Sequence, residues 1–374
     1  MEELGKEEIE KLYKLDKCDR CGDCLDEATG CKILGYDRER AIKEVTALVE
    51  GRDTPVLTDC ITCQACQAFC TKGVNIWNWI AHRMDTENTW SPHAFSRDRL
   101  NLWNLFLAVH RPWLMQKGDP DKPWLGVGIA YLMLSPPGDM NMFKNNRIFK
   151  GLNIFTGTDL GAAGVARAHG GWENATDPEC REYLKVVIDR MNTISGGKEI
   201  ILAHDEDFGA MSQAKEQGMD IPFKYRHVVE YYNEYIKDHK EDVKPLGFKV
   251  AHQNNCSVPY GPSREAWFDE FYELIGCTRV KRKYDRENRM CCMGASAFHL
   301  WAGDPERGIP SDVERGAELR KRNVDDAVAN GATHMSFICP ACNNTLAEEC
   351  IDAGIVPISI HDLAKMAFGD KTVR

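Results

Sequence analysis

Residues 60–70 read CITCQACQAFC and place cysteines at positions 60, 63, 66 and 70. This is the ferredoxin spacing, in which three closely spaced thiolates surround one four-iron cluster and the fourth cysteine reaches a second cluster. Ferredoxins usually have proline after the fourth cysteine, and this chain has Thr71 there. The segment therefore predicts a small helical domain that holds two neighbouring [4Fe-4S] clusters.

A second motif, CDRCGDC, stands upstream at residues 18–24 and repeats the same intervals. Its fourth cysteine, Cys31, follows after six intervening residues instead of three. The crossover rule of two-cluster ferredoxins assigns one cluster to Cys18, Cys21, Cys24 and Cys70, and the other to Cys60, Cys63, Cys66 and Cys31. A pair of structural zinc sites is the alternative, because C-x2-C pairs also suit tetrahedral zinc. The third cysteine at the same interval in both motifs favours iron and sulfur.

The residues between the two motifs predict a helix. Ala41, Ile42, Val45, Leu48 and Val49 recur at helical spacing, and Gly51 ends the pattern. We expect a helical ferredoxin-type domain over residues 1–85. A linker is expected over residues 86–123, where HRPW and GDPDKPW are irregular, proline-broken connections.

Beyond residue 124, short apolar runs alternate with longer amphipathic stretches, as is typical of an α/β domain. Strands are predicted at residues 199–203, 248–252, 335–338 and 356–360. One helix is predicted from Ser311, with Glu314 completing a capping box, to the residues before Gly331; another begins at Asp177 with Pro178 in its first turn. We therefore expect an α+β multidomain chain whose α/β domain covers residues 124–374.

Five further cysteines are expected at the carboxyl ends of strands, where α/β folds gather their ligands: Cys256, Cys291, Cys292, Cys339 and Cys342. A helix should begin just after CPAC at 339–342, and its N-terminus lowers the pKa of nearby thiols. Adjacent cysteines suit a larger metal assembly better than a closed tetrahedral site, because successive side chains of a strand diverge. Cys180, Cys277 and Cys350 fit no motif, and we expect them to be buried free thiols.

A weak internal repeat pairs GAAGVARAHGG at 161–171 with CCMGASAFHL at 291–300, which divides the α/β region into halves 124–245 and 246–374. In this alignment the first half has Ala162 and Ala163 at the positions of the cysteine pair. It has His204 and Asp207 at the positions of the CPAC cysteines. The first half is therefore degenerate. We interpret His204 and Asp207 as solvated loop residues, with an altered metal site or a proton-delivery pair as alternatives.

The order of one cysteine, a cysteine pair and then C-P-x-C resembles the CCG domain of the heterodisulfide reductase catalytic subunit and its relatives. CCMG stands in place of the usual CCG, so the signature glycine is displaced to Gly294. With two ferredoxin motifs upstream, the chain looks like a fusion of the two-cluster small subunit with the CCG subunit. The resemblance implies one non-cubane [4Fe-4S] cluster, whose ligands in a reductase are also catalytic, at Cys256, Cys291, Cys292, Cys339 and Cys342.

The resemblance also implies a function. The chain would be an iron–sulfur electron-transfer subunit of a flavin-based electron-bifurcating complex, with a flavin-bearing heterodisulfide reductase-type subunit and further redox subunits as partners. A class II benzoyl-CoA reductase complex is one setting. The alternatives are a heterodisulfide or thiol-disulfide reductase catalytic subunit, and a ferredoxin-like relay with structural zinc in the CCG domain. Loss of the duplicate ligand set favours the electron-transfer subunit.

The composition of the chain limits its possible functions and its location. A net charge of −10 argues against nucleic-acid binding, which needs Lys and Arg against phosphates. The charged opening residues and the lack of a long apolar run predict a cytoplasmic protein without a membrane span. In that reducing compartment 16 cysteines indicate metal ligation instead of disulfides. We expect no nicotinamide or flavin in this chain, because no convincing G-x-G-x-x-G follows a strand.

Overall fold

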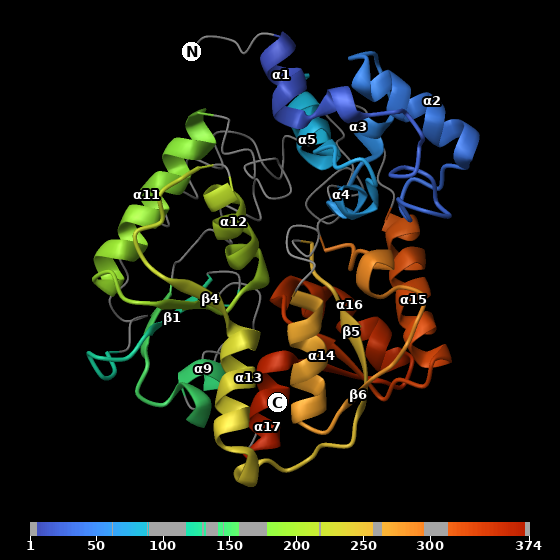
Figure 1. Ribbon diagram of the computed structural model, residues 1–374. Coiled ribbons are helices and arrows are strands. Elements are labelled where there is room, and N and C mark those ends of the chain that lie inside the picture. Colours follow the sequence, from blue (N-terminus) through green and yellow to red (C-terminus); the bar gives the residue numbers. More distant parts are fainter. Residues whose placement is uncertain are drawn as a thin grey trace.

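The computed structural model describes residues 6–61, 63–87, 89, 117–128, 131, 141–144, 146–156, 178–216, 218–256, 264–294 and 313–370. In these residues the chain has an N-terminal helical part and a C-terminal α/β part with two parallel four-stranded sheets, as expected. Figure 1 shows the helical part at one end of the molecule. Within the described ranges, no helix combines the length and apolar character that a membrane crossing requires.

The helical part contains two longer helices, and side chains of the second donate hydrogen bonds to the end of the first. Its elements are α1 (Lys6–Tyr13), η1 (Leu15–Lys17), α2 (Arg38–Val49), α3 (Val56–Asp59), α4 (Ala65–Phe69) and α5 (Ile76–Thr86). The Asp37 carboxylate caps α2 by accepting from the Arg40 N–H, and Gly51 at φ 71° follows its end, as the pattern predicts. Trp79 and Arg83 of α5 donate to the Leu48 carbonyl. The predicted linker at 86–123 lies mostly outside the described residues.

The two sheets share one order of strands. The first contains β1 (Trp124–Val127), β2 (Asn153–Thr156), β3 (Ile200–Leu202) and β4 (Tyr225–His227), in the order β2-β1-β3-β4. The second contains β5 (Lys249–Gln253), β6 (Thr278–Arg279), β7 (His334–Phe337) and β8 (Val356–Ser359), in the order β6-β5-β7-β8. The strands predicted from sequence correspond to β3, β5, β7 and β8. Since every pairing is parallel, the carboxyl ends of each sheet meet at one edge.

Helices connect and cover these strands. They are α9 (Asn141–Lys144), η3 (Arg147–Phe149), α11 (Pro178–Ser195), α12 (Asp205–Glu216), α13 (Val228–Asp238), η4 (Lys240–Asp242), α14 (Arg264–Leu274), η6 (Arg286–Asn288), α15 (Val313–Ala329), α16 (Pro340–Asp352) and α17 (Ile360–Ala367). Pro178 opens α11 and Glu314 lies in the first turn of α15, which ends before Gly331 as predicted. The predicted starts at Asp177 and Ser311 lie outside the described residues.

The two halves of the α/β part share a core. Figure 1 shows α13, α14 and α17 side by side between the sheets, and Tyr232, Phe271 and Ile360 from these helices are fully buried in one cluster. The Tyr131 hydroxyl lies within hydrogen-bonding distance of the carbonyls of Ala203 and Ile338, which follow β3 and β7. The carboxyl ends of these two strands therefore face each other.

A buried ion pair also crosses between the halves. Arg264, at the start of α14, contacts the carboxylate of Asp205, at the start of α12, at 2.6 Å. His227 contacts the same carboxylate at 2.8 Å, and all three side chains are at most 1% exposed. Burial raises the pKa of Asp205, but Arg264 and His227 outweigh it and hold that pKa well below its ordinary value. The contact fixes the loop that follows β3.

We expect Arg264→Met to lower the free energy of unfolding by about 3–5 kcal/mol, because it removes the cation that compensates a buried carboxylate. Adding Asp205→Asn should recover part of the loss. Lys185→Met, which breaks the exposed Lys185–Asp189 pair on α11, should cost less than about 1 kcal/mol. Chemical denaturation measures all three. Equal losses for Arg264→Met and Lys185→Met would contradict the assignment.

Candidate metal centres

The first group of cysteines gathers around one cavity in the helical part. Cys18, Cys21, Cys24 and Cys70 line it and are called the Cys18 group. Burial raises the pKa of Cys24, and the neighbouring thiolates of Cys70, Cys18 and Cys21 raise it further. Gly22 makes this turn possible, since its φ is 80° and a Cβ there would lie 2.9 Å from the Ile42 nitrogen. The last cysteine of the second motif thus lies with the first motif, in the arrangement that the crossover rule requires.

The second group lies next to the first. Burial raises the pKa of Cys66, and the thiolates of Cys60, Cys24, Cys63 and Cys31 raise it further. Cys31, Cys60, Cys63 and Cys66 are called the Cys60 group. A compact turn absorbs the longer interval before Cys31, because a Cβ on Gly30 would lie 2.1 Å from the Asp23 carbonyl oxygen. Cys24 belongs to the Cys18 group and is also a neighbour of Cys66, so the two groups lie side by side.

The third group gathers at the carboxyl edge of the second sheet. Five thiols form a chain of contacts, in which each contacts the next: Cys256, Cys291, Cys292, Cys342 and Cys339. They are called the Cys256 group. All five side chains are buried. Cys339 occupies the N-cap position of α16, where the helix dipole favours a thiolate. Sulfur is therefore the dominant donor in all three groups. This donor set fits iron–sulfur clusters. The role of each cysteine as a ligand stays a prediction.

Backbone N–H groups also point at the cysteine pair. The Met293 and Gly294 N–H groups donate to Cys291 Sγ and Cys292 Sγ, both at 3.3 Å. Contacts with Cys291 and Cys342 lower the pKa of Cys292 to about 6, and burial opposes this. Met293 has a φ of 64°, the left-handed conformation that glycine adopts more easily. Gly294 lies in a tight space, because a Cβ there would lie 3.0 Å from Thr345 Oγ1 and 3.2 Å from Cys292 Sγ.

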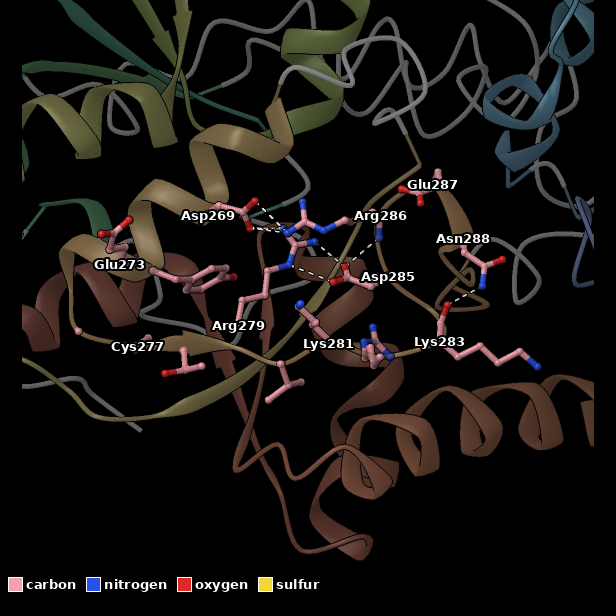
Figure 2. Close-up of a pocket in the computed structure, with 15 residues that line it drawn as sticks. Asp269, Glu273, Cys277, Arg279, Lys281, Lys283, Asp285, Arg286, Glu287 and Asn288 are labelled. Atoms are coloured by element: carbon pink, nitrogen blue, oxygen red, sulfur yellow. Dashed lines mark hydrogen bonds and ion pairs between the residues drawn. The ribbon is translucent and has the colours of Figure 1, made fainter.

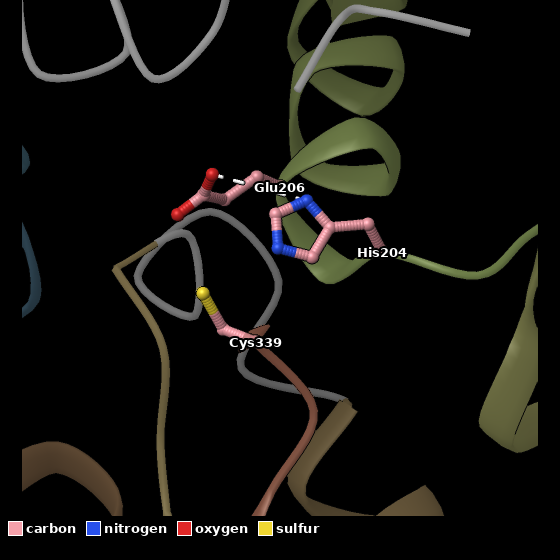
Figure 3. Close-up of side chains that lie close together, drawn as sticks. All are labelled: His204, Glu206 and Cys339. Atoms are coloured by element: carbon pink, nitrogen blue, oxygen red, sulfur yellow. Dashed lines mark ion pairs between the residues drawn. The ribbon is translucent and has the colours of Figure 1, made fainter. Parts of the chain in front are cut away.

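The interpretation of His204 and Asp207 as solvated loop residues is wrong. Both side chains are 0% exposed, because the loop after β3 packs against the loop after β7. Figure 3 shows the His204 ring and the Glu206 carboxylate beside Cys339. Burial lowers the pKa of His204, but the charges of Glu206 and Cys339 outweigh it and raise that pKa to about 10. Ala162 and Ala163 lie outside the described residues.

Sequence reasoning missed Arg289. Its side chain is 4% exposed, and its Nη2 lies 3.4 Å from the Cys256 carbonyl oxygen. Burial lowers the pKa of this guanidinium, and the thiolates of Cys256, Cys63 and Cys291 oppose that effect. The positive charge therefore lies between the Cys60 group and the Cys256 group. The sequence gives only a weak signal for Arg289, because it is simply a basic residue two positions before the cysteine pair.

Other cysteines and another hollow lie apart from these groups. Cys277 and Cys350 are buried, as expected, and Cys180 is on α11. Figure 2 shows a hollow of about 820 Å³ beside β6, lined by Cys277 and by charged side chains. Several of the charges pair with one another: Arg286 contacts Asp269 at 2.8 Å and Arg279 Nε donates to Asp285 at 3.1 Å. This hollow is thus built from internal ion pairs.

We expect Gly294→Ala to lower the metal content of the Cys256 group several-fold, because the new methyl group would press on Thr345 Oγ1 and on Cys292 Sγ. Gly354→Ala is the matched control. Gly354 has a φ of 77° and open space around it, so this change costs about 1 kcal/mol without touching a sulfur. Iron analysis of both variants measures the effect. An equal loss in the control would mean that general destabilisation, not crowding of the sulfur, is the cause.

The comparisons with known proteins complete the description of these centres. No protein-family model matches the chain. A search of curated proteins gives no match. The chain itself is rich in cysteine, with C-x2-C spacings and three gathered groups of thiols that suggest metal or iron–sulfur binding.

Proposed function

We propose that this chain is an iron–sulfur electron-transfer subunit that carries two cubane [4Fe-4S] clusters and one non-cubane cluster. The observation that carries the proposal is the continuous series of thiol groups. Cys24 of the Cys18 group neighbours Cys66 of the Cys60 group. Cys63 of the Cys60 group in turn neighbours Cys256 and Cys291 of the Cys256 group. Three redox centres in this order would form a path from the helical part into the α/β part.

The protein's own residues have separable tasks in this proposal. Iron–sulfur clusters held by the three groups would supply one-electron transfer. The thiols of the Cys60 and Cys256 groups are mostly buried, which keeps water from the path and strengthens local electrostatics. The N–H groups of Met293 and Gly294 stabilise negative charge on the cysteine pair. Arg289 adds a fixed positive charge between the second and third groups.

We further infer that the α/β part arose by internal duplication, with a degenerate half 124–245 and a ligand-bearing half 246–374. Support comes from the common strand order of the two sheets. The last strand of each sheet also ends on a side chain that caps the next helix: His227 accepts from the Val229 N–H, and Ser359 accepts from the His361 N–H. A single thiolate set in the α/β part favours an electron relay over a paired-cluster reductase.

The proposed setting is a flavin-based electron-bifurcating oxidoreductase complex of the heterodisulfide reductase type. In that setting a flavin-bearing subunit exchanges electrons with this chain, and an electron-transfer role beside a class II benzoyl-CoA reductase is one form of it. This part of the proposal rests on the motif resemblance. Co-purification under anaerobic conditions tests it, and a partner without any redox cofactor would contradict it.

We expect the anaerobically purified chain to contain about twelve irons, in three four-iron clusters. Cys339→Ser should lower this to about eight, because it removes a ligand of the Cys256 group alone. Cys350→Ser, which changes a cysteine outside the groups, should leave it unchanged. Iron and acid-labile sulfide analysis measures these numbers. Wild-type protein with about eight irons and one zinc would instead favour the relay with a structural zinc site.

We expect Arg289→Met to lower the midpoint potentials of the clusters in the Cys60 and Cys256 groups by on the order of tens of millivolts. Reduction adds negative charge, which the guanidinium stabilises. Arg289→Lys keeps the charge and should shift the potentials less. A potentiometric titration followed by electron paramagnetic resonance measures the shifts. The cluster of the Cys18 group is the internal control, and a uniform shift of all three clusters would contradict the placement.

A further inference from the structure

A mixed set of metal-binding side chains lies where the two halves of the α/β part meet. One donor atom each from His204, Glu206 and Cys339 lies within 4.8 Å of the others, and all three residues are buried. Figure 3 shows the three side chains together: His204 lies between β3 and α12, Glu206 lies in the first turn of α12, and Cys339 lies between β7 and α16. The Tyr131 hydroxyl, which approaches the carbonyls just before His204 and Cys339, holds the two loops together.

These buried side chains have few hydrogen bonds, and they compensate one another mainly by charge. Among the described residues, neither His204 Nδ1, His204 Nε2 nor Glu206 Oε2 has a hydrogen-bond partner. Their exposed fractions are 0% for His204 and 5% for Glu206. A buried polar group without a partner costs about 1–3 kcal/mol, and a charged group costs more. One nitrogen of His204 and one carboxylate oxygen of Glu206 lie close to the Cys339 sulfur, and a bound cation would stabilise this arrangement.

We propose that His204, Glu206 and Cys339 bind a divalent metal ion of the zinc class. The donors are one imidazole nitrogen, one carboxylate oxygen and one thiolate, a set that suits borderline-soft divalent ions. Tetrahedral zinc places such donors about 3.5 Å apart. His204 Nδ1 and Glu206 Oε2 are 3.9 Å apart, so small side-chain rotations bring the set to bonding distance.

The site goes beyond the proposed electron-transfer function and does not depend on it. Cys339 is also one of the proposed cluster ligands, and a thiolate sulfur has lone pairs for two metal ions. His204 and Glu206 belong to the other half and are outside every cysteine group. Three protein ligands leave one tetrahedral position for water or for a sulfur ligand, as in zinc sites that bind a substrate.

The test uses the full chain, purified anaerobically with its clusters and supplied with zinc alone as the added metal. Elemental analysis should give about one zinc per chain beside the iron. Zinc X-ray absorption should show one sulfur neighbour, at about 2.3 Å, and nitrogen or oxygen neighbours at about 2.0–2.2 Å. No zinc in iron-loaded protein, or zinc with four sulfur neighbours, would overturn the proposal.

Variants locate the site. His204→Ala should reduce bound zinc at least tenfold and leave iron unchanged, and His239→Ala, a matched change on the far end of α13, should alter neither. Glu206→Gln should weaken zinc binding at least tenfold, because the neutral amide is a poorer donor. His204→Cys should keep the zinc and raise its sulfur neighbours from one to two, which also decides the matter if His204→Ala does not fold.

The two proposals fail in different ways. Retention of zinc in His204→Ala, with one sulfur neighbour still present, would overturn the metal site and leave the clusters untouched. Zinc with the expected neighbours in a chain that takes up no iron would support the metal site and overturn the electron-transfer function.

Discussion

The structure depends on one electrostatic constraint, the gathering of many sulfur atoms in a protein interior. Thiolates that lie close together in a low-dielectric region repel one another, and burial already disfavours the charged form. The raised pKa values of Cys24 and Cys66 have this origin. The fold brings thirteen motif cysteines into three such groups, and cations bound among them would turn this repulsion into attraction.

The helical part is packed firmly against the second half of the α/β part, which places the cysteine groups of the two parts near each other. Tyr284, Met290 and Met293 of the second half are buried in one cluster with residues of the helical part. Arg322 on α15 pairs with Glu27 at 3.0 Å, and Arg315 donates to the Ile33 carbonyl in the loop that follows Cys31. These contacts fix the separation between the Cys60 and Cys256 groups by packing, so electron transfer between centres bound there would need no docking step within the chain.

Local patterns predicted much of this fold, and long-range packing explains what they missed. Residue spacing, propensity and size act within a few residues. They are enough to predict the helix α2, the strands β3, β5, β7 and β8, and the burial of Cys277 and Cys350. Ile42 is 42% exposed although it belongs to the predicted apolar pattern, and it lies on the side of α2 that faces Gly22. Arg289 gave almost no signal, since one arginine among 47 basic residues becomes special only when two distant cysteine groups meet around it.

His204 shows most clearly how such long-range packing changes the meaning of a residue. It follows β3 by two positions, and Cys339 follows β7 by two positions. The parallel registers also agree, because Leu202 pairs with His227 and Phe337 pairs with Ser359, each the cap of the next helix. Taken alone, the loop after β3 would be open to solvent, where a histidine and two carboxylates are ordinary. Packed against its counterpart, this segment turns equivalent positions of two similar sheets toward one point, so that His204 and Glu206 of the first half face Cys339 of the second.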